Sequence, residues 1–161
     1  MIKLFRNTED KISLTAPCKG QIIPLNQVKD AMFANKVLGD GFALIPEDDV
    51  ICAPCCGRIM MIASTAHAFG IKLKNGAEIL VHIGLDTVNL NGKGFTLMMH
   101  MNQKVKQGMP LLKIDRTYMV AQNLDLTVPV ILMNDDQHEL VHHVCKGEAN
   151  CNLTIASVVS R

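Results

Sequence analysis

The stretch STAHAFGIKLKNGAEILVHIGLDTV, residues 64–88, contains two short apolar runs on either side of Asn75-Gly76. Runs of this length that are rich in Ile, Leu and Val are typical of β-strands. Asn-Gly is a strong hairpin signal, because both central positions of a type I′ turn need a positive φ. We therefore predict an antiparallel hairpin in which His67 and His82 lie on neighbouring strands.

Gly, Pro and Asn-Gly interrupt the rest of the chain at similar intervals, and the segments between them are rich in Ile, Val and Leu. This pattern favours an all-β fold, an antiparallel β-sandwich or barrel. Residues 26–39 and 115–124 break the pattern and predict short helical turns, the second capped by Asp115. Residues 134–152 are interpreted as a hairpin or loop, followed by a last strand over residues 153–159.

The chain length and composition predict one domain over residues 1–161, because no linker or shift in composition divides the 161 residues. Residues 16–22 resemble residues 53–59, which is compatible with duplication of a β-motif. The net charge is +1. A surface with so little net charge is not expected to attract nucleic acid or anionic lipid.

No apolar run approaches the length of about 18 residues that a membrane helix needs. The first ten residues, MIKLFRNTED, lack the apolar region of a secretory signal, so a cytoplasmic protein is expected. The six cysteines are then expected to be free thiols. Cys52-x-x-Cys55 lacks a matching second pair, and its apolar neighbours indicate core packing rather than a zinc site.

The phosphate-binding, dinucleotide-binding and serine-hydrolase motifs are all missing from the sequence, so the histidines are the remaining candidates for chemistry. A single histidine on an apolar strand is usually a satisfied core residue. Two histidines on paired strands weaken that interpretation. Thr65, His67, His82 and Asp86 could form an orienting hydroxyl, a supporting imidazole, a nucleophilic imidazole and an acid. Partial burial would keep the nucleophile neutral.

A zinc hydrolase is an alternative hypothesis from another class. In it, His67, His82 and Asp86 would bind the metal, and a further histidine would complete the set. The candidates for that further ligand are His100, His142 and His143. No Glu stands beside these residues to act as a general base, so we expect no metal site.

Three longer stretches carry a resemblance to a known family. They are APCKGQIIPLNQVKDAMFANKVLGDGFALIPEDDVICAPCCGRI (residues 16–59), TAHAFGIKLKNGAEILVHIGLDTVNLNGKGF (residues 65–95) and GMPLLKID (residues 108–115). Together they resemble the glucose-type IIA component of the bacterial phosphoenolpyruvate-dependent sugar phosphotransferase system, over roughly residues 12–134. The resemblance implies an antiparallel β-sandwich, described in that family as a duplicated hybrid motif.

The resemblance also implies a phosphotransferase component that works through a phosphohistidine and needs no other cofactor. A phosphohistidine of the carrier protein HPr would donate to Nε2 of His82, which would pass the group to a cysteine of the IIB domain of a sugar permease. His67 would stabilise the phosphoryl group and Thr65 would orient His67. The implied partners are HPr and the IIB domain. The protein would meet the inner face of the membrane transiently, through the permease, without inserting into it.

The resemblance further implies a docking rim for these partners. Asp30 and Asp86 match acidic residues that would face the basic surface of HPr. The apolar part of the rim is expected from Met32, Phe33, Leu38, Leu80 and Val88, with Phe33 exposed. Such a face would equally suit a regulatory binding module that target proteins recognise according to its phosphorylation state. That module is the second hypothesis.

Overall fold

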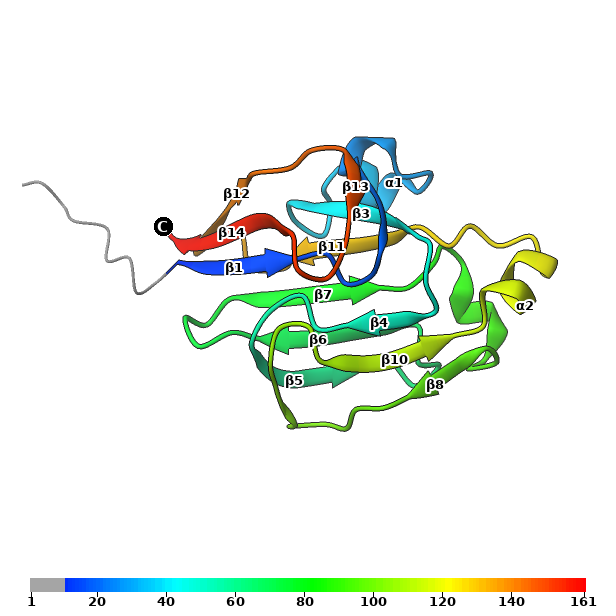
Figure 1. Ribbon diagram of the computed structural model, residues 1–161. Coiled ribbons are helices and arrows are strands. Elements are labelled where there is room, and N and C mark those ends of the chain that lie inside the picture. The colour runs from blue at the N-terminus through cyan, green and yellow to red at the C-terminus, as the bar shows by residue number, and fades with distance from the viewer. Residues whose placement is uncertain (1–10) are drawn as a thin grey trace, which may run out of the picture.

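The computed structural model describes residues 11–161, and its regular structure consists mainly of antiparallel strands (Figure 1). The expectation about an export signal falls on the first ten residues, which lie outside the described part. The largest sheet has eight strands in the order β13-β2-β3-β11-β7-β6-β5-β9. Their bounds are β2 Gly20–Pro24, β3 Gly41–Pro46, β5 Gly57–Ile62, β6 Ala68–Lys72, β7 Glu78–His82, β9 Lys104–Val105, β11 Val128–Leu132 and β13 Gly147–Ala149.

Two three-stranded sheets complete the sandwich, in the orders β1-β14-β12 and β4-β10-β8. Their bounds are β1 Ile12–Thr15, β12 His138–His142, β14 Thr154–Ser160, β4 Val50–Cys52, β8 Phe95–Leu97 and β10 Pro110–Ile114. Side chains from all three sheets share one aliphatic core, for example Leu14, Ile51 and Ile79, which are each at most 1% exposed. The predicted all-β sandwich is confirmed.

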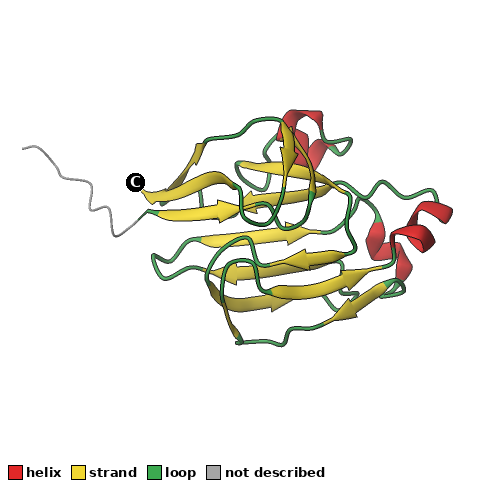
Figure 2. Ribbon diagram, in the orientation of Figure 1, coloured by secondary structure: helices red, strands yellow, loops and turns green. Residues whose placement is uncertain are grey.

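In the described part of the chain, helices occupy two small regions at the margin of the sandwich (Figure 2). They are the 3-10 helices η2 Leu25–Gln27 and η3 Thr87–Leu90 and the α-helices α1 Ala31–Ala34 and α2 Arg116–Ala121. The predicted cap of α2 is confirmed, because the Asp115 carboxylate accepts a hydrogen bond from the Tyr118 N–H. Within residues 11–161, no helix has the length and apolar character needed to cross a membrane.

The hairpin of β6 and β7 forms as predicted, with Ala68 opposite His82 and Lys72 opposite Glu78. Its turn differs from the predicted type I′, because only Gly76 has a positive φ, of 85°. The Gly76 N–H donates to the Leu73 carbonyl at 3.0 Å, and the Leu73 N–H donates to the Ala77 carbonyl at 2.8 Å. This is another common type of hairpin connection, in which a turn is followed by one left-handed residue that forms a bulge.

The two similar segments at residues 16–22 and 53–59 lie against each other. The Thr15 N–H donates to the Pro54 carbonyl at 2.8 Å, and the Cys52 N–H donates to the Pro17 carbonyl at 2.6 Å. The exchange is reciprocal, as expected for two copies of one motif related by a local twofold axis. All six cysteines lie in the described part and are free thiols, and Cys52 and Cys55 are buried in the core as predicted.

The C-terminal region differs from the single hairpin or loop that was predicted. β12 pairs with the last strand, β14, while β13 crosses to the large sheet and pairs with β2. His138 at the start of β12 is buried and its Nε2 is bonded to the Asn75 carbonyl at 2.9 Å, which ties this segment to the β6–β7 turn.

Gly41 allows β3 to approach β11, the strand that places β7 in the middle of the large sheet. A Cβ at this position would lie 2.1 Å from the Val130 carbonyl oxygen, a backbone atom that cannot move aside. We expect Gly41→Ala to lower the free energy of unfolding by about 3 kcal/mol, measured by urea denaturation. Gly70→Ala is the matched control, because its nearest atom is the flexible Met60 Cγ at 3.3 Å. Equal effects of the two substitutions would contradict this explanation.

Candidate functional site

The two histidines of the hairpin meet at one end of it. His82 is the last residue of β7, and His67 immediately precedes β6. The Ile83 N–H donates to the His67 carbonyl at 2.7 Å, which fixes the two backbones side by side. The ring centroids are 5.0 Å apart, with the rings nearly edge to face at 75°. The predicted neighbourhood of the two imidazoles is therefore formed.

The hydrogen-bond partner of the His82 ring determines which ring nitrogen carries the proton. Its Nδ1 lies 2.8 Å from the Gly84 carbonyl oxygen, which can only accept, so Nδ1 carries the proton. In a neutral ring, Nε2 then keeps its lone pair. Gly84 has a φ of 78°, and a Cβ there would lie 2.4 Å from Thr87 Cγ2. The reasoning from sequence missed Gly84, although a glycine two residues after the histidine was the available signal.

Thr65 holds the second imidazole, with its Oγ1 2.6 Å from His67 Nδ1. Both residues lie in the turn before β6 rather than on a strand. Ala66 between them has a φ of 61°, a left-handed conformation that costs about 1 kcal/mol or more for a residue with a Cβ. When the hydroxyl donates to Nδ1, the proton of a neutral His67 ring lies on Nε2.

Burial lowers the pKa of both histidines below the ordinary value of 6.5. At His82 the nearby His67 acts in the same direction, while the Gly84 carbonyl and the carboxylates of Asp30 and Asp86 oppose the shift. Both rings are therefore neutral at pH 7. A neutral imidazole with a free Nε2 lone pair is a nucleophile, and a neighbouring imidazole can donate a hydrogen bond to the group it attacks.

The two predicted acidic residues stand at this end of the sheet. The Asp30 carboxylate caps α1 by accepting from the Met32 N–H at 2.9 Å. Asp86 begins η3 with a left-handed φ of 61°, and its side chain makes no capping bond to that helix. Asp86 is exposed, so its carboxylate is available to a positively charged partner.

The apolar residues predicted for the rim separate into two groups. Met32 and Val88 are exposed, at 49% and 46%, and Leu38 is half-buried. The expectation that Phe33 is exposed is wrong, because it is 5% exposed, and Leu80 is also buried. A second small apolar cluster beneath the site holds both residues, along with Leu25, Val28, Ala43, Ala68, Leu85 and Ile131.

The short helix α1 explains this separation. After the Asp30 cap, the chain turns so that Phe33 faces the sheet, where its ring lies 5.0 Å from the His82 ring. Met32 and Val37 are left outside, and Val37, which the sequence reasoning missed, is 62% exposed. Phe33 is therefore a wall of the histidine site rather than part of its outer rim.

The structure does not assemble the ligand set of the zinc alternative. His142 Nε2 is 2.9 Å from an Asp40 carboxylate oxygen, and His143 Nε2 is 2.8 Å from the Ser157 hydroxyl. His100 is exposed and its Nδ1 is bonded to the Met101 carbonyl. No group of three or more His, Cys, Asp or Glu side chains within residues 11–161 is arranged to hold a metal ion.

The packing of Phe33 against His82 predicts a measurable effect on its titration. Phe33→Ala would let water reach the imidazole, so the pKa of His82 is expected to rise toward 6.5, and the unfolding free energy to fall by about 3 kcal/mol. Histidine resonances followed by NMR against pH would measure the shift. Met32→Ala, which removes an exposed neighbour, should leave the pKa of His82 unchanged. A variant Phe33→Ala with an unaltered His82 titration would contradict the role of this ring.

Comparison with known proteins places the chain in a family. The family model of the phosphoenolpyruvate-dependent sugar phosphotransferase system, EIIA 1, matches residues 12–138. The fold is similar to that of the solved glucose permease IIA from Mycoplasma capricolum, with a TM-score of 0.82 and 37% identity. That match covers 91% of this chain and 95% of the other. This chain therefore belongs to the EIIA 1 family of the sugar phosphotransferase system.

Proposed function

We propose that this chain is a phosphoryl carrier that accepts phosphate on Nε2 of His82 and passes it on for sugar uptake. The donor would be the phosphohistidine of HPr, and the acceptor a cysteine of the IIB domain of a sugar permease. The chain would therefore meet the inner face of the membrane only through that permease. The single observation that carries the proposal is the bond from His82 Nδ1–H to the Gly84 carbonyl, which leaves Nε2 as the nucleophilic atom.

In the first transfer, the Nε2 lone pair of His82 forms a bond to phosphorus while the nitrogen–phosphorus bond of the donor breaks. The donor leaves as a neutral imidazole, and the positive charge moves to the His82 ring, which keeps its Nδ1 proton. The Gly84 carbonyl stabilises that charge. In the second transfer, a cysteine thiolate attacks phosphorus, the bond to Nε2 breaks, and His82 returns to the neutral form.

His67 supports the transferring group rather than carrying it. Phosphoryl transfer depends on positioning and on stabilisation of charge over the equatorial oxygens. An imidazole 5.0 Å away, oriented by Thr65, can offer its Nε2–H to those oxygens. The proposed roles are phosphoryl acceptor for His82, phosphoryl stabilisation for His67 and a positioning role for Thr65.

The surface around the histidines suits partners that dock in turn. Met32, Val37 and Val88 provide exposed apolar contacts, and Asp86 provides an exposed negative charge. An apolar patch with a charged margin is a common composition for a transient interface. We propose that HPr binds here first and that the IIB domain binds the same face after HPr has left.

Phosphorylation with purified components tests the proposal. The chain is incubated with phosphoenolpyruvate, enzyme I and HPr, and the acid-labile phosphate is located by mass spectrometry and by phosphorus NMR. We expect one phosphate for each chain, on Nε2 of His82. A phosphate on His67, on Nδ1 of His82 or on no residue at all would contradict the proposal.

A further inference from the structure

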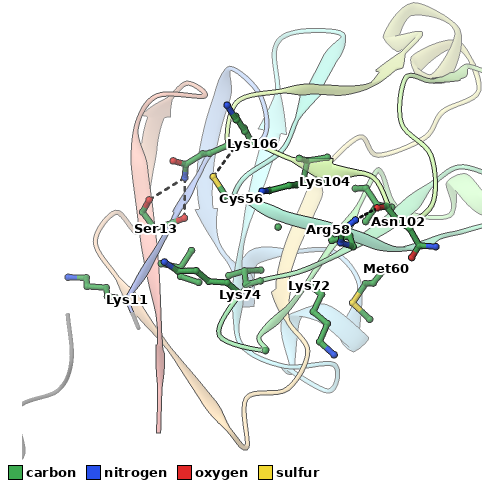
Figure 3. A pocket seen from close by; sticks show the side chains of 17 residues that line it. Lys11, Ser13, Cys56, Arg58, Met60, Lys72, Lys74, Asn102, Lys104 and Lys106 are labelled. Atoms are coloured by element: carbon green, nitrogen blue, oxygen red, sulfur yellow. Dashed lines mark hydrogen bonds between the residues drawn. The ribbon is translucent and has the colours of Figure 1, made fainter. Parts of the chain in front are cut away.

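An open pocket of about 1020 Å³ lies at the other end of the β6–β7 hairpin from the histidines. Figure 3 shows the pocket and the side chains that line it. Its lining includes six basic residues and, among the described residues, no acidic one. The basic residues are Lys11, Arg58, Lys72, Lys74, Lys104 and Lys106. The whole chain has 16 basic and 15 acidic residues, so positive charge is strongly concentrated here.

Three of these cations form a row across neighbouring strands. Arg58 on β5 pairs in register with Lys104 on β9 and with Lys72 on β6. Directly opposed residues point to the same face of a sheet, and like charges in that arrangement are destabilising. Glu78 lies opposite Lys72 on the other side, where its negative charge favours that pair, but it does not line the pocket. Such a row of like charges lowers the stability of the fold, and binding of an anion would explain why these cations stand together.

The other contacts leave these charges available. The Arg58 guanidinium donates to the Asn102 carbonyl at 2.7 Å, which positions it without neutralising it. The ion pairs formed within residues 11–161 use Lys36, Arg116 and His142, none of which lines this pocket. Lys74 and Lys106 lie just after β6 and β9, and Lys11 lies just before β1; all three line the same pocket (Figure 3).

The rest of the lining is partly apolar and includes Ile12, Met60 and Leu73. Apolar lining suits a ligand with an organic body rather than free phosphate. The volume is of the size that binds metabolites, roughly 300 to 1000 Å³. Strands lie about 4.8 Å apart, so the backbones of Lys104 and Lys72 are separated by roughly 10 Å, wide enough for two anionic groups. The described part of the lining holds no aromatic ring for stacking bases, which disfavours single-stranded nucleic acid.

We propose that this pocket binds a small organic molecule that carries two or more phosphate groups. The row of Lys104, Arg58 and Lys72 engages the phosphates, and the apolar lining contacts the organic body. The site is separate from His67 and His82, and the proposal does not depend on phosphoryl transfer by this chain.

Calorimetric titration of the full chain tests the proposal, with fructose 1,6-bisphosphate, ATP and inorganic phosphate as probes. At 0.15 M salt the Debye length is about 8 Å, so distant charges contribute little. We expect at least one of the two organic probes to bind more tightly than inorganic phosphate. The double variant Arg58→Gln/Lys72→Gln should weaken that binding by about 100-fold, roughly tenfold for each cation. NMR shift changes should map to β5, β6 and β9.

A matched control variant distinguishes the loss of pocket contacts from a general loss of positive charge. Lys19→Gln/Lys113→Gln removes the same charge from exposed positions outside the pocket and should leave binding unchanged. Thermal unfolding checks that both double variants fold. Equal weakening by both double variants, no preference over inorganic phosphate, or no binding of either organic probe would overturn the proposal. A parallel sedimentation assay uses phosphatidylserine vesicles, and binding to these vesicles without binding of either organic probe would overturn the proposal in favour of a membrane contact.

Discussion

Substitution of His82 by alanine is expected to abolish phosphoryl acceptance from phospho-HPr. The variant lacks the Nε2 lone pair, and no other imidazole of the site has the same arrangement, because the Nδ1 of His67 is bonded to Thr65 rather than to a backbone carbonyl. The alanine side chain is small and the position is half-buried, so the fold should persist. Labelling with radioactive phosphoenolpyruvate in the presence of enzyme I and HPr measures the result.

His100→Ala is the matched control for this experiment. His100 is exposed and is bonded to the Met101 carbonyl at 3.1 Å, so its loss should leave labelling at the level of the unaltered chain. One phosphate for each chain on the His82→Ala variant would show that the nucleophile has been assigned to the wrong residue.

Substitution of His67 by glutamine is expected to separate the two transfers. Acceptance should continue, because the attacking His82 is neutral and an amide can still donate a hydrogen bond to the phosphoryl oxygens. Delivery to the IIB domain should fall by about 10² to 10³. There the attacking thiolate and the phosphoryl group are both negative, and an imidazole can take up a proton to offset that charge whereas an amide cannot. Rapid-quench measurement of each half-reaction gives the two rates.

Thr65→Val provides a second variant for the same question. It keeps the shape of the side chain but removes the 2.6 Å bond to His67 Nδ1, so a smaller loss confined to delivery is expected. If His67→Gln slowed both transfers equally, His67 would be a general positioning residue. If it slowed neither, His67 would have no part in the reaction.

The pairing of the two histidines was predictable because a hairpin is a local structure. The apolar runs on both sides of Asn75-Gly76 fix which two strands pair, so His67 and His82 could be placed near each other without any knowledge of the remaining sheets. The turn type was not fixed in the same way, since a type I′ turn and a turn with a bulge both accept Asn-Gly and differ in register by a single residue.

The burial of Phe33 and Leu80 could not be predicted in that manner. α1 has only four residues, too few for a periodic pattern to show which side faces inward. The direction of Phe33 depends on how this turn packs on β3, β7 and β11, which are distant in sequence. Gly84 was missed because it acts through its backbone carbonyl oxygen, which accepts the bond from His82. The sequence does not indicate in which direction a backbone carbonyl points.

The pairing of β1 with β14 has a consequence for how the protein is made. Residues 12–15 find their partners only at residues 154–158, so this edge of the sandwich cannot close until translation has passed Val158. Contacts between such distant segments slow folding, because a long loop must be closed before any stabilising contact forms. We therefore expect a nascent chain that is still attached to the ribosome at β12 to remain sensitive to protease, and the finished chain to become resistant in one cooperative step.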